Sequence, residues 1–83
     1  MNQTGRTAKQ IGAIIRRARR NAGLTQTALG KRIGLRQATI SKLEAGESAT
    51  RLSTLLDALT ALGLEIIIDT RGKNSKHDLE DLF

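Results

Sequence analysis

Residues 24–46 of this 83-residue chain read LTQTALGKRIGLRQATISKLEAG and predict two short helices in close succession. Thr25 can cap the first helix, over residues 26–33, and Gly34 can end it in the left-handed conformation. A second helix is expected over residues 37–45. Only three residues connect the two helices, which is too few for antiparallel neighbours and typical of helices that cross at a large angle. The stretch therefore predicts a helix-turn-helix.

A longer helix is expected before this stretch, beginning after Thr7 and ending near Ala22, with Gly23 as its stop. Its apolar residues recur every three or four positions and predict one buried stripe. Arg19 lies at the edge of that stripe, four residues after Ile15, so it is the arginine that most needs a partner inside the protein. The residues of the stripe are Ile11, Ile14, Ile15, Ala18 and Ala22.

A fourth helix is expected over residues 51–62, with Thr50 or Ser48 as its N-cap and Gly63 as its end. A leucine stripe runs along it, which at the length of one helix indicates a core-facing side more often than a dimer zipper. Together the four helices predict a mainly α fold with an aliphatic core, in keeping with 39% hydrophobic residues and a single Phe. The stripe consists of Leu52, Leu55, Leu56, Leu59 and Leu62.

The segment over residues 64–69, LEIIID, is the one β-like stretch of the chain, because consecutive isoleucines suit a strand better than a helix. A lone strand leaves its backbone donors and acceptors unpaired, and the sequence predicts no second strand to complete it. We therefore expect it to pair with the same strand of a second subunit across a two-fold axis. The residues expected in this dimer strand are Leu64, Ile66, Ile67 and Ile68.

The charged residues divide the chain into a basic half and an acidic half. Residues 1–42 contain ten Lys or Arg and no Asp or Glu, and the first carboxylate is Glu44. All eight acidic residues and the other four basic ones follow, and the net charge is +6. A positive field on one side of a molecule suits a polyanion such as nucleic acid or an anionic membrane. For any single basic cluster, the alternative is a solvated face.

The outward side of the expected helix over residues 37–45 is polar and small, which suits entry into the major groove of DNA. Gln37 offers the bidentate amide that matches adenine, Ala38 a methyl for thymine, and Lys42 a cation for guanine or phosphate. A solvated helix face is the alternative, but the abrupt turn before it and the acid-free basic half favour DNA. The outward residues are Gln37, Ala38, Ser41, Lys42 and Ala45, opposite Ile40 and Leu43.

Residues 24–46 resemble the Xre/Cro family of helix-turn-helix proteins, and the resemblance extends over roughly residues 8–63. It is carried by Gln26 at the start of the second helix, the Gly34 turn, Ile40, and the end of the third helix at Glu44 to Gly46. The resemblance implies a lambda-repressor-like four-helix domain in which an arginine of the first helix pairs with the glutamate that ends the third. Those residues would be Arg19 and Glu44 here, in agreement with the position of Arg19 on its helix.

Within that family, residues 36–41 followed by one helix and one strand are most similar to HipB-type antitoxins. In that group the strand forms a two-stranded sheet between subunits, the dimer represses its own operon, and it binds a HipA-type kinase toxin. We therefore expect double-stranded DNA with a pseudo-palindromic operator, a second copy of the chain and a HipA-like kinase as partners, and no cofactor. Base contacts are expected from Arg36, Gln37, Ala38, Ser41 and Lys42, and phosphate contacts from Gln26, Thr27, Lys31, Arg32 and Thr39.

Two positions depart from the family pattern. Gly30 replaces the usual alanine, which lowers the stability of a helix by up to about 1 kcal/mol. Phe83 stands where the best-known relative has tryptophan, so the function of the tail does not carry over from the resemblance. The last six residues, DLEDLF, are acidic with three large apolar side chains, a composition that can order on a partner.

We expect a disordered N-terminus over residues 1–6, a DNA-binding domain over 7–69 and a flexible C-terminal tail over 70–83. Cysteine is absent and the single histidine, His77, lies in the tail, so neither catalysis nor a metal site is expected. No apolar run approaches the roughly 18 residues of a membrane span, and the N-terminus lacks the pattern of a signal peptide. We therefore expect a cytoplasmic protein.

Other functions are compatible with the same sequence. The chain could be a stand-alone transcriptional regulator without a toxin partner, or chiefly a scaffold that inhibits a partner enzyme while DNA binding is incidental. Binding of the arginine-rich first helix to a membrane surface is a third interpretation. It ranks lowest because the core needs the isoleucines of that helix.

Overall fold

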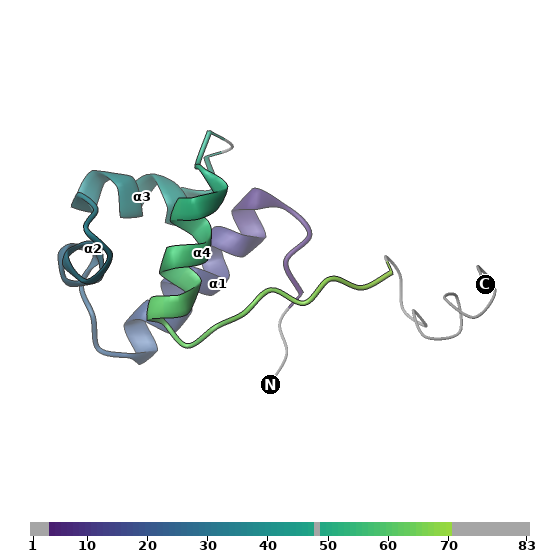
Figure 1. Ribbon diagram of the computed structural model, residues 1–83, viewed down its shortest axis with the longest axis horizontal. Helices are drawn as coiled ribbons and strands as arrows, with labels where there is room; N and C mark the ends of the chain where they lie inside the picture. Colours follow the sequence, from purple (N-terminus) through teal and green to yellow (C-terminus); the bar gives the residue numbers. More distant parts are fainter. Residues whose placement is uncertain (1–3, 48, 71–83) are drawn as a thin grey trace.

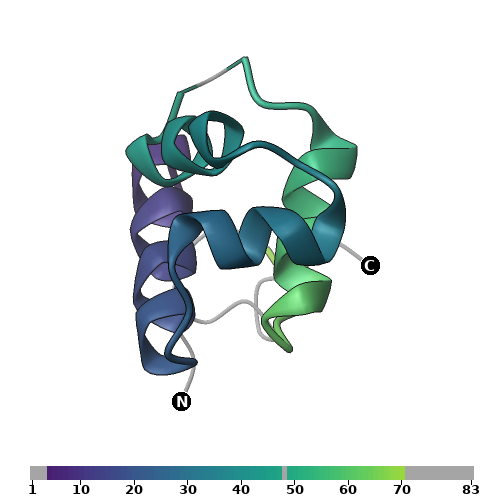
Figure 2. The same ribbon diagram turned by 90° about the vertical axis from the view of Figure 1, so that its left-hand side faces the viewer.

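The computed structural model describes residues 4–47 and 49–70, and four helices form its body (Figure 1). α3 packs against α1 and α2, and α2 also packs against α4. Seen from the side of α2, α1 and α4 stand on either side while α2 crosses in front of them (Figure 2). The predicted four-helix fold is thus confirmed. The helices are α1, Ala8–Asn21; α2, Gln26–Ile33; α3, Gln37–Ala45; and α4, Leu52–Ala61.

Threonine side chains begin the first two helices, as the sequence predicts. Oγ1 of Thr7 accepts a hydrogen bond from the backbone N–H of Gln10 at 3.1 Å, and Oγ1 of Thr25 accepts one from Ala28 at 3.0 Å. Each bond satisfies one of the N–H groups that have no partner within a helix N-terminus. Gly34 ends α2 with a φ of 72°, the left-handed conformation that glycine adopts without steric strain.

The start of α4 differs from its prediction. The helix begins at Leu52, and Arg51 holds the N-cap position without a capping hydrogen bond from its side chain. Thr50, one of the two predicted caps, instead donates from Oγ1 to the carbonyl oxygen of Glu47 at 3.1 Å. Its hydroxyl therefore stabilises the preceding turn rather than the helix. Ser48, the other predicted cap, lies outside the described residues.

The leucine stripe of α4 is only partly buried, so the prediction of one core-facing row was wrong. Leu52 is 66% exposed and Leu56 is 43% exposed, whereas the other three leucines are buried or half-buried. The small side chain of Ala58 is fully buried. The buried and half-buried residues Leu55, Ala58, Leu59 and Leu62 share one side of the helix, and Leu56, about 100° around from Leu55, lies on its flank. Leu52 is the first residue of α4.

The core is small and aliphatic. Ile15, Leu29 and Ile40 are fully buried, so each of the first three helices supplies one large side chain that water does not reach. Ala22, predicted in the stripe of α1, is exposed because the helix ends one residue before it. A cluster of Ile15, Leu43, Ala58 and Leu59 forms the centre, with Ile11, Ile33, Leu55, Leu62 and Leu64 packed against it.

Residues 64–70 follow α4 without regular secondary structure, and over the described ranges the single chain contains no strand. The N–H of Leu64 donates to the carbonyl oxygen of Leu59 at 2.8 Å and its side chain packs on the core, and its place in a dimer strand stays a prediction. The segment beyond it runs away from the helices (Figure 1). Ile66 (47%), Ile67 (72%) and Ile68 (93%) are exposed.

The sequence predicts a disordered N-terminus over residues 1–6 and a flexible tail over residues 70–83, and the structure describes only part of each range. Residues 1–3 and 71–83, with His77 and Phe83, lie outside the described residues. The domain boundaries at residues 7 and 69 stay predictions.

Two glycines allow backbones to approach closely. A Cβ atom at Gly12 would lie 2.5 Å from the carbonyl oxygen of Glu44 and 2.6 Å from that of Leu43. A Cβ atom at Gly30 would lie 2.5 Å from the carbonyl oxygen of Leu35, in the turn between α2 and α3. The helix propensity lost at Gly30 is thus offset by the tight turn that it permits.

We expect Gly12→Ala to lower the free energy of unfolding by about 1–3 kcal/mol, because the added methyl group overpacks the contact between α1 and α3. Helix propensity alone would give the opposite sign, a gain of about 1 kcal/mol. Urea denaturation followed by circular dichroism measures the difference. Ala13→Gly, at an exposed neighbouring position, reports propensity alone. An increase in stability for Gly12→Ala would contradict the close approach.

Candidate nucleic-acid interface

α3 presents a small, polar side to solvent. Ile40 and Leu43 are buried on its inward side. The outward side has short or flexible side chains, which permit the close approach that entry into a DNA groove requires. Gln37, Ala38, Lys42 and Ala45 are exposed, and Thr39 and Ser41 are half-buried.

The start of α2 lies beside the start of α3. Gln26, the first residue of α2, is half-buried, and its Oε1 accepts a hydrogen bond from Nε2 of Gln37 at 2.5 Å. Thr27 follows it and is exposed. The structure therefore brings together a residue predicted to contact phosphate and one predicted to read a base.

The cationic side chains predicted to contact DNA are spread more widely. Lys31 and Arg32 lie in the last turn of α2, at the opposite end from Gln26, and both are exposed. Arg36 holds the N-cap position of α3 without a capping bond and is exposed as well. These three side chains thus flank the turn of the helix-turn-helix, whereas Lys42 lies in the last turn of α3.

Beneath this surface, Arg19 of α1 and Glu44 of α3 form a buried ion pair. Nε of Arg19 donates to Oε2 of Glu44 at 2.6 Å, and Nη2 donates to Oε1 at 3.0 Å. The two residues are only 7% and 8% exposed. Nη1 of Arg19 also donates to the carbonyl oxygen of Leu24 at 2.7 Å, before the start of α2. The pair that the resemblance implied is therefore present, and it connects three segments.

Gln26 joins the buried ion pair to the outward side of α3. Its Nε2 donates to Oε1 of Glu44 at 3.1 Å, while its Oε1 accepts from Gln37. A continuous series of hydrogen bonds thus runs from Arg19 through Glu44 and Gln26 to Gln37. Sequence reasoning missed the two bonds of Gln26. The available signal was that both glutamines are the first residues of successive helices.

The carboxyl group of Glu44 has a pKa below its ordinary value. Burial raises this pKa, but hydrogen bonds from Arg19 and Gln26 and the charges of Arg19 and Arg16 lower it by more. The hydrogen bond to Glu44 raises the pKa of the Arg19 guanidinium, against the opposing effect of burial. Both groups are therefore charged at neutral pH, and each neutralises the other within the protein.

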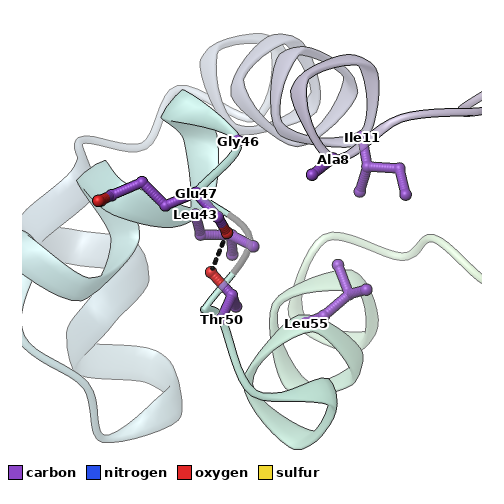
Figure 3. A pocket seen from close by; sticks show the side chains of 7 residues that line it. All are labelled: Ala8, Ile11, Leu43, Gly46, Glu47, Thr50 and Leu55. Carbon is purple, nitrogen blue, oxygen red and sulfur yellow. Dashed lines mark hydrogen bonds between the residues drawn. The ribbon is translucent and has the colours of Figure 1, made fainter.

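A small apolar hollow lies elsewhere, between the start of α1, the end of α3 and α4 (Figure 3). The carboxylate of Glu47 points away from it, and the hydroxyl of Thr50 is engaged by the carbonyl oxygen of Glu47. Its lining therefore offers no charged group to a ligand. The lining residues are Ala8, Ile11, Leu43, Gly46, Glu47, Thr50 and Leu55.

The described part of the chain has neither a cluster of metal-binding side chains nor a membrane-spanning helix. Residues 4–47 and 49–70 contain no group of three or more His, Cys, Asp or Glu side chains that could hold a metal ion. None of the helices in this part of the chain is long and apolar enough to cross a membrane.

Known proteins share this arrangement. A family model described as helix-turn-helix matches residues 15–67. The antitoxin HipB of Escherichia coli K12 is 36% identical over 59 residues, which cover 71% of this chain and 67% of that protein. The chain belongs to the HipB family of helix-turn-helix proteins. HipB of the O6:H1 strain CFT073 is also 36% identical over 59 residues, which cover 63% of its length.

Solved HipB structures have the same fold over most of this chain. A complex of a HipB variant with the O2 20mer has a TM-score of 0.80 at 30% identity, covering 87% of this chain and 100% of that one. The complex of HipB with the O4 20mer has a TM-score of 0.79 at 31% identity, and the HipA–HipB–O2–O3 complex has 0.78 at 31%. Both cover 86% of this chain and 100% of the matched chain.

We expect the buried ion pair to make stability depend on pH. A carboxyl whose pKa is lower in the folded chain than in the unfolded chain stabilises the fold above the unfolded pKa, and this contribution is lost as the pH falls through the folded pKa. The stability advantage of the wild type over Glu44→Gln should therefore shrink as the pH is lowered from about 5. Denaturant unfolding at a series of pH values measures it, and a difference independent of pH would contradict the assignment.

Proposed function

We propose that the chain is a sequence-specific DNA-binding repressor and the antitoxin of a HipA-like kinase. The observation that carries this proposal is the small, polar outward side of α3, with Gln37 held by Gln26 at its start. The HipB relatives support it, because they have been solved with operator DNA and with HipA. The protein would act in the cytoplasm by binding alone, without catalysis.

Base recognition is assigned to the outward side of α3. The amide of Gln37 can pair with adenine through two hydrogen bonds, and the methyl group of Ala38 can pack on that of thymine. Arg36 and Lys42, near the two ends of the helix, can reach guanine. Ser41 adds a hydroxyl that can donate to or accept from a base edge. Short side chains in the middle and cations near the ends suit a helix that enters the major groove.

Phosphate contacts are assigned to α2 and to the start of α3. Gln26 and Thr27 lie at the positive end of the α2 dipole, where a phosphate is attracted. Thr39 contributes a hydroxyl, and Lys31 and Arg32 contribute charge from the other end of α2. Because each neutralised phosphate releases counterions, the affinity should fall with salt with a log–log slope near −0.9 per contact.

We expect Gln37→Ala to weaken binding to the operator by about 1–3 kcal/mol and to relax the preference at one base pair. Lys31→Ala is the matched control at a phosphate-contacting position. It should weaken all sequences alike and reduce the salt slope by about 1. Fluorescence anisotropy with DNA from upstream of the protein's own reading frame, and with a scrambled duplex, measures both. An equal loss on both duplexes for Gln37→Ala would contradict base reading.

We also propose that two chains pair through the segment around Ile66–Ile68. These three isoleucines are exposed in the single chain, and their backbone groups need partners if the segment is to form a strand. An isologous pair of strands would supply those partners and shield the isoleucines from water. Two α3 helices of such a dimer would enter successive major grooves about 34–36 Å apart.

Ile67→Lys is expected to shift the protein toward monomers, because like charges would meet near the two-fold axis of the paired strands. The operator affinity should fall with it, since each monomer holds one recognition helix. Glu65→Gln, at an exposed position nearby, is the control and should stay dimeric. Analytical ultracentrifugation at micromolar concentration reports the state. A wild-type chain that sediments as a monomer there would overturn the dimer.

The kinase partner can be tested by co-expression with the reading frame next to the gene for this protein. A complex that survives high salt and contains a kinase-like chain would support the antitoxin role. Absence of such a complex, together with specific operator binding, would instead identify a stand-alone regulator.

A further inference from the structure

Glu44 has a role beyond the ion pair. We propose that its carboxylate fixes the direction in which Gln37 presents its amide, and thereby which base α3 reads. The inference rests on the proposed function, in which Gln37 contacts a base edge. Glu44 is thus a positioning residue for DNA recognition, acting through Gln26.

The ionised carboxylate of Glu44 accepts hydrogen bonds but cannot donate them. Oε1 of Glu44 lies 3.1 Å from Nε2 of Gln26 and 3.0 Å from Nη2 of Arg19. If the amide of Gln26 were turned over, its carbonyl oxygen would face a carboxylate oxygen with no hydrogen between them. The NH2 end of Gln26 must therefore face Glu44, and its Oε1 must face the other way.

Gln26 imposes a direction on the amide of Gln37 at the surface. Oε1 of Gln26 can only accept, so Gln37 must turn its NH2 end toward it, as the 2.5 Å bond from Nε2 shows. A primary amide has two N–H bonds. One is used by Gln26, so the second N–H and Oε1 of Gln37 stay free as a neighbouring donor and acceptor. That pattern matches N7 and N6 of adenine, whereas guanine presents two acceptors, N7 and O6.

Burial keeps the ion pair of Arg19 and Glu44 from rearranging. The side chains of Arg19 and Glu44 are only 9% and 3% exposed, so water does not compete for their hydrogen bonds. Nη1 of Arg19 is also fixed by the carbonyl oxygen of Leu24. Arginine has no acceptor, so it always directs an oxygen of residue 44 toward itself.

An amide at position 44 would remove the fixed direction of the series with almost no change of shape. Arg19 donates to both oxygens of Glu44, so in Glu44→Gln either orientation of the new amide sets its NH2 group against one N–H of Arg19, and both an oxygen and an NH2 group can face Gln26. Where the NH2 group faces Gln26, Gln26 accepts from residue 44 and donates to Oε1 of Gln37. Gln37 would be left with two N–H groups facing outward, which suit the two acceptors of guanine.

The test is the base preference at the one operator position whose preference Gln37→Ala abolishes. Binding is measured for the four duplexes that differ only there. The wild type should prefer adenine, and Glu44→Gln should lower the adenine-to-guanine affinity ratio by at least about fivefold, the lower range expected for one bidentate contact. A folded Glu44→Gln protein with the wild-type ratio would overturn the inference.

Two further variants distinguish a change in the direction of the Gln37 amide from a loss of fold stability. Arg19→Lys disturbs the same buried pair but retains the carboxylate, so it should lower stability while the adenine-to-guanine ratio stays at the wild-type value. Gln26→Met interrupts the series but leaves both hydrogen bonds between Arg19 and Glu44 in place, and the ratio should fall toward 1. Gln26→Met decides the matter if Glu44→Gln does not fold. An unchanged ratio in Gln26→Met would also overturn the inference.

Failure of this inference differs from failure of the proposed function. If Gln37→Ala leaves the base preference unchanged at every position, Gln37 does not read a base and the assignment of the recognition side is wrong. If Gln37→Ala abolishes a preference that Glu44→Gln and Gln26→Met both retain, only the directing role of Glu44 is wrong.

Discussion

One guanidinium and one carboxylate, both buried, hold the helix-turn-helix of this small domain against its first helix. Arg19 reaches from α1 to Glu44 on α3 and to the carbonyl oxygen of Leu24 before α2. Such pairs contribute little net stability, because desolvation opposes the attraction, but removing one partner destabilises a protein by about 3–5 kcal/mol. The pair therefore acts chiefly as a geometric constraint on three helices. Gly12 complements it by letting α1 touch the last turn of α3.

The parts of the fold that depend on neighbouring residues could be predicted from the sequence, and those that depend on distant contacts could not. Thr25 and Gly34 determine the ends of α2 through bonds and dihedral angles within a few residues. The buried side of α4, by contrast, depends on which helices pack against it. Burial of Ala58 leaves Leu56 outside, and nothing in the spacing of five leucines distinguishes that arrangement from a single row.

The candidate site shows the same division. A helical projection identifies the outward residues of α3, because the period of a helix and the position of Ile40 suffice for that. The hydrogen bonds of Gln26 join residues that are 18 and 11 positions apart, and they depend on how α2 and α3 cross. Strand pairing around Ile67 is a property of two chains, so it stays a prediction for the single chain described here.

Leu64 gives the segment after α4 a fixed point of departure, since its N–H and its side chain are both bound to the helical domain. In a dimer joined at Ile66–Ile68, only Glu65 would separate that anchor from the paired strands. This one-residue linkage would be too short to let the two helical domains of the dimer move far relative to each other. The number of base pairs between operator half-sites would then be governed by this short linkage, and an inserted residue there would put the two halves out of phase with the DNA helix.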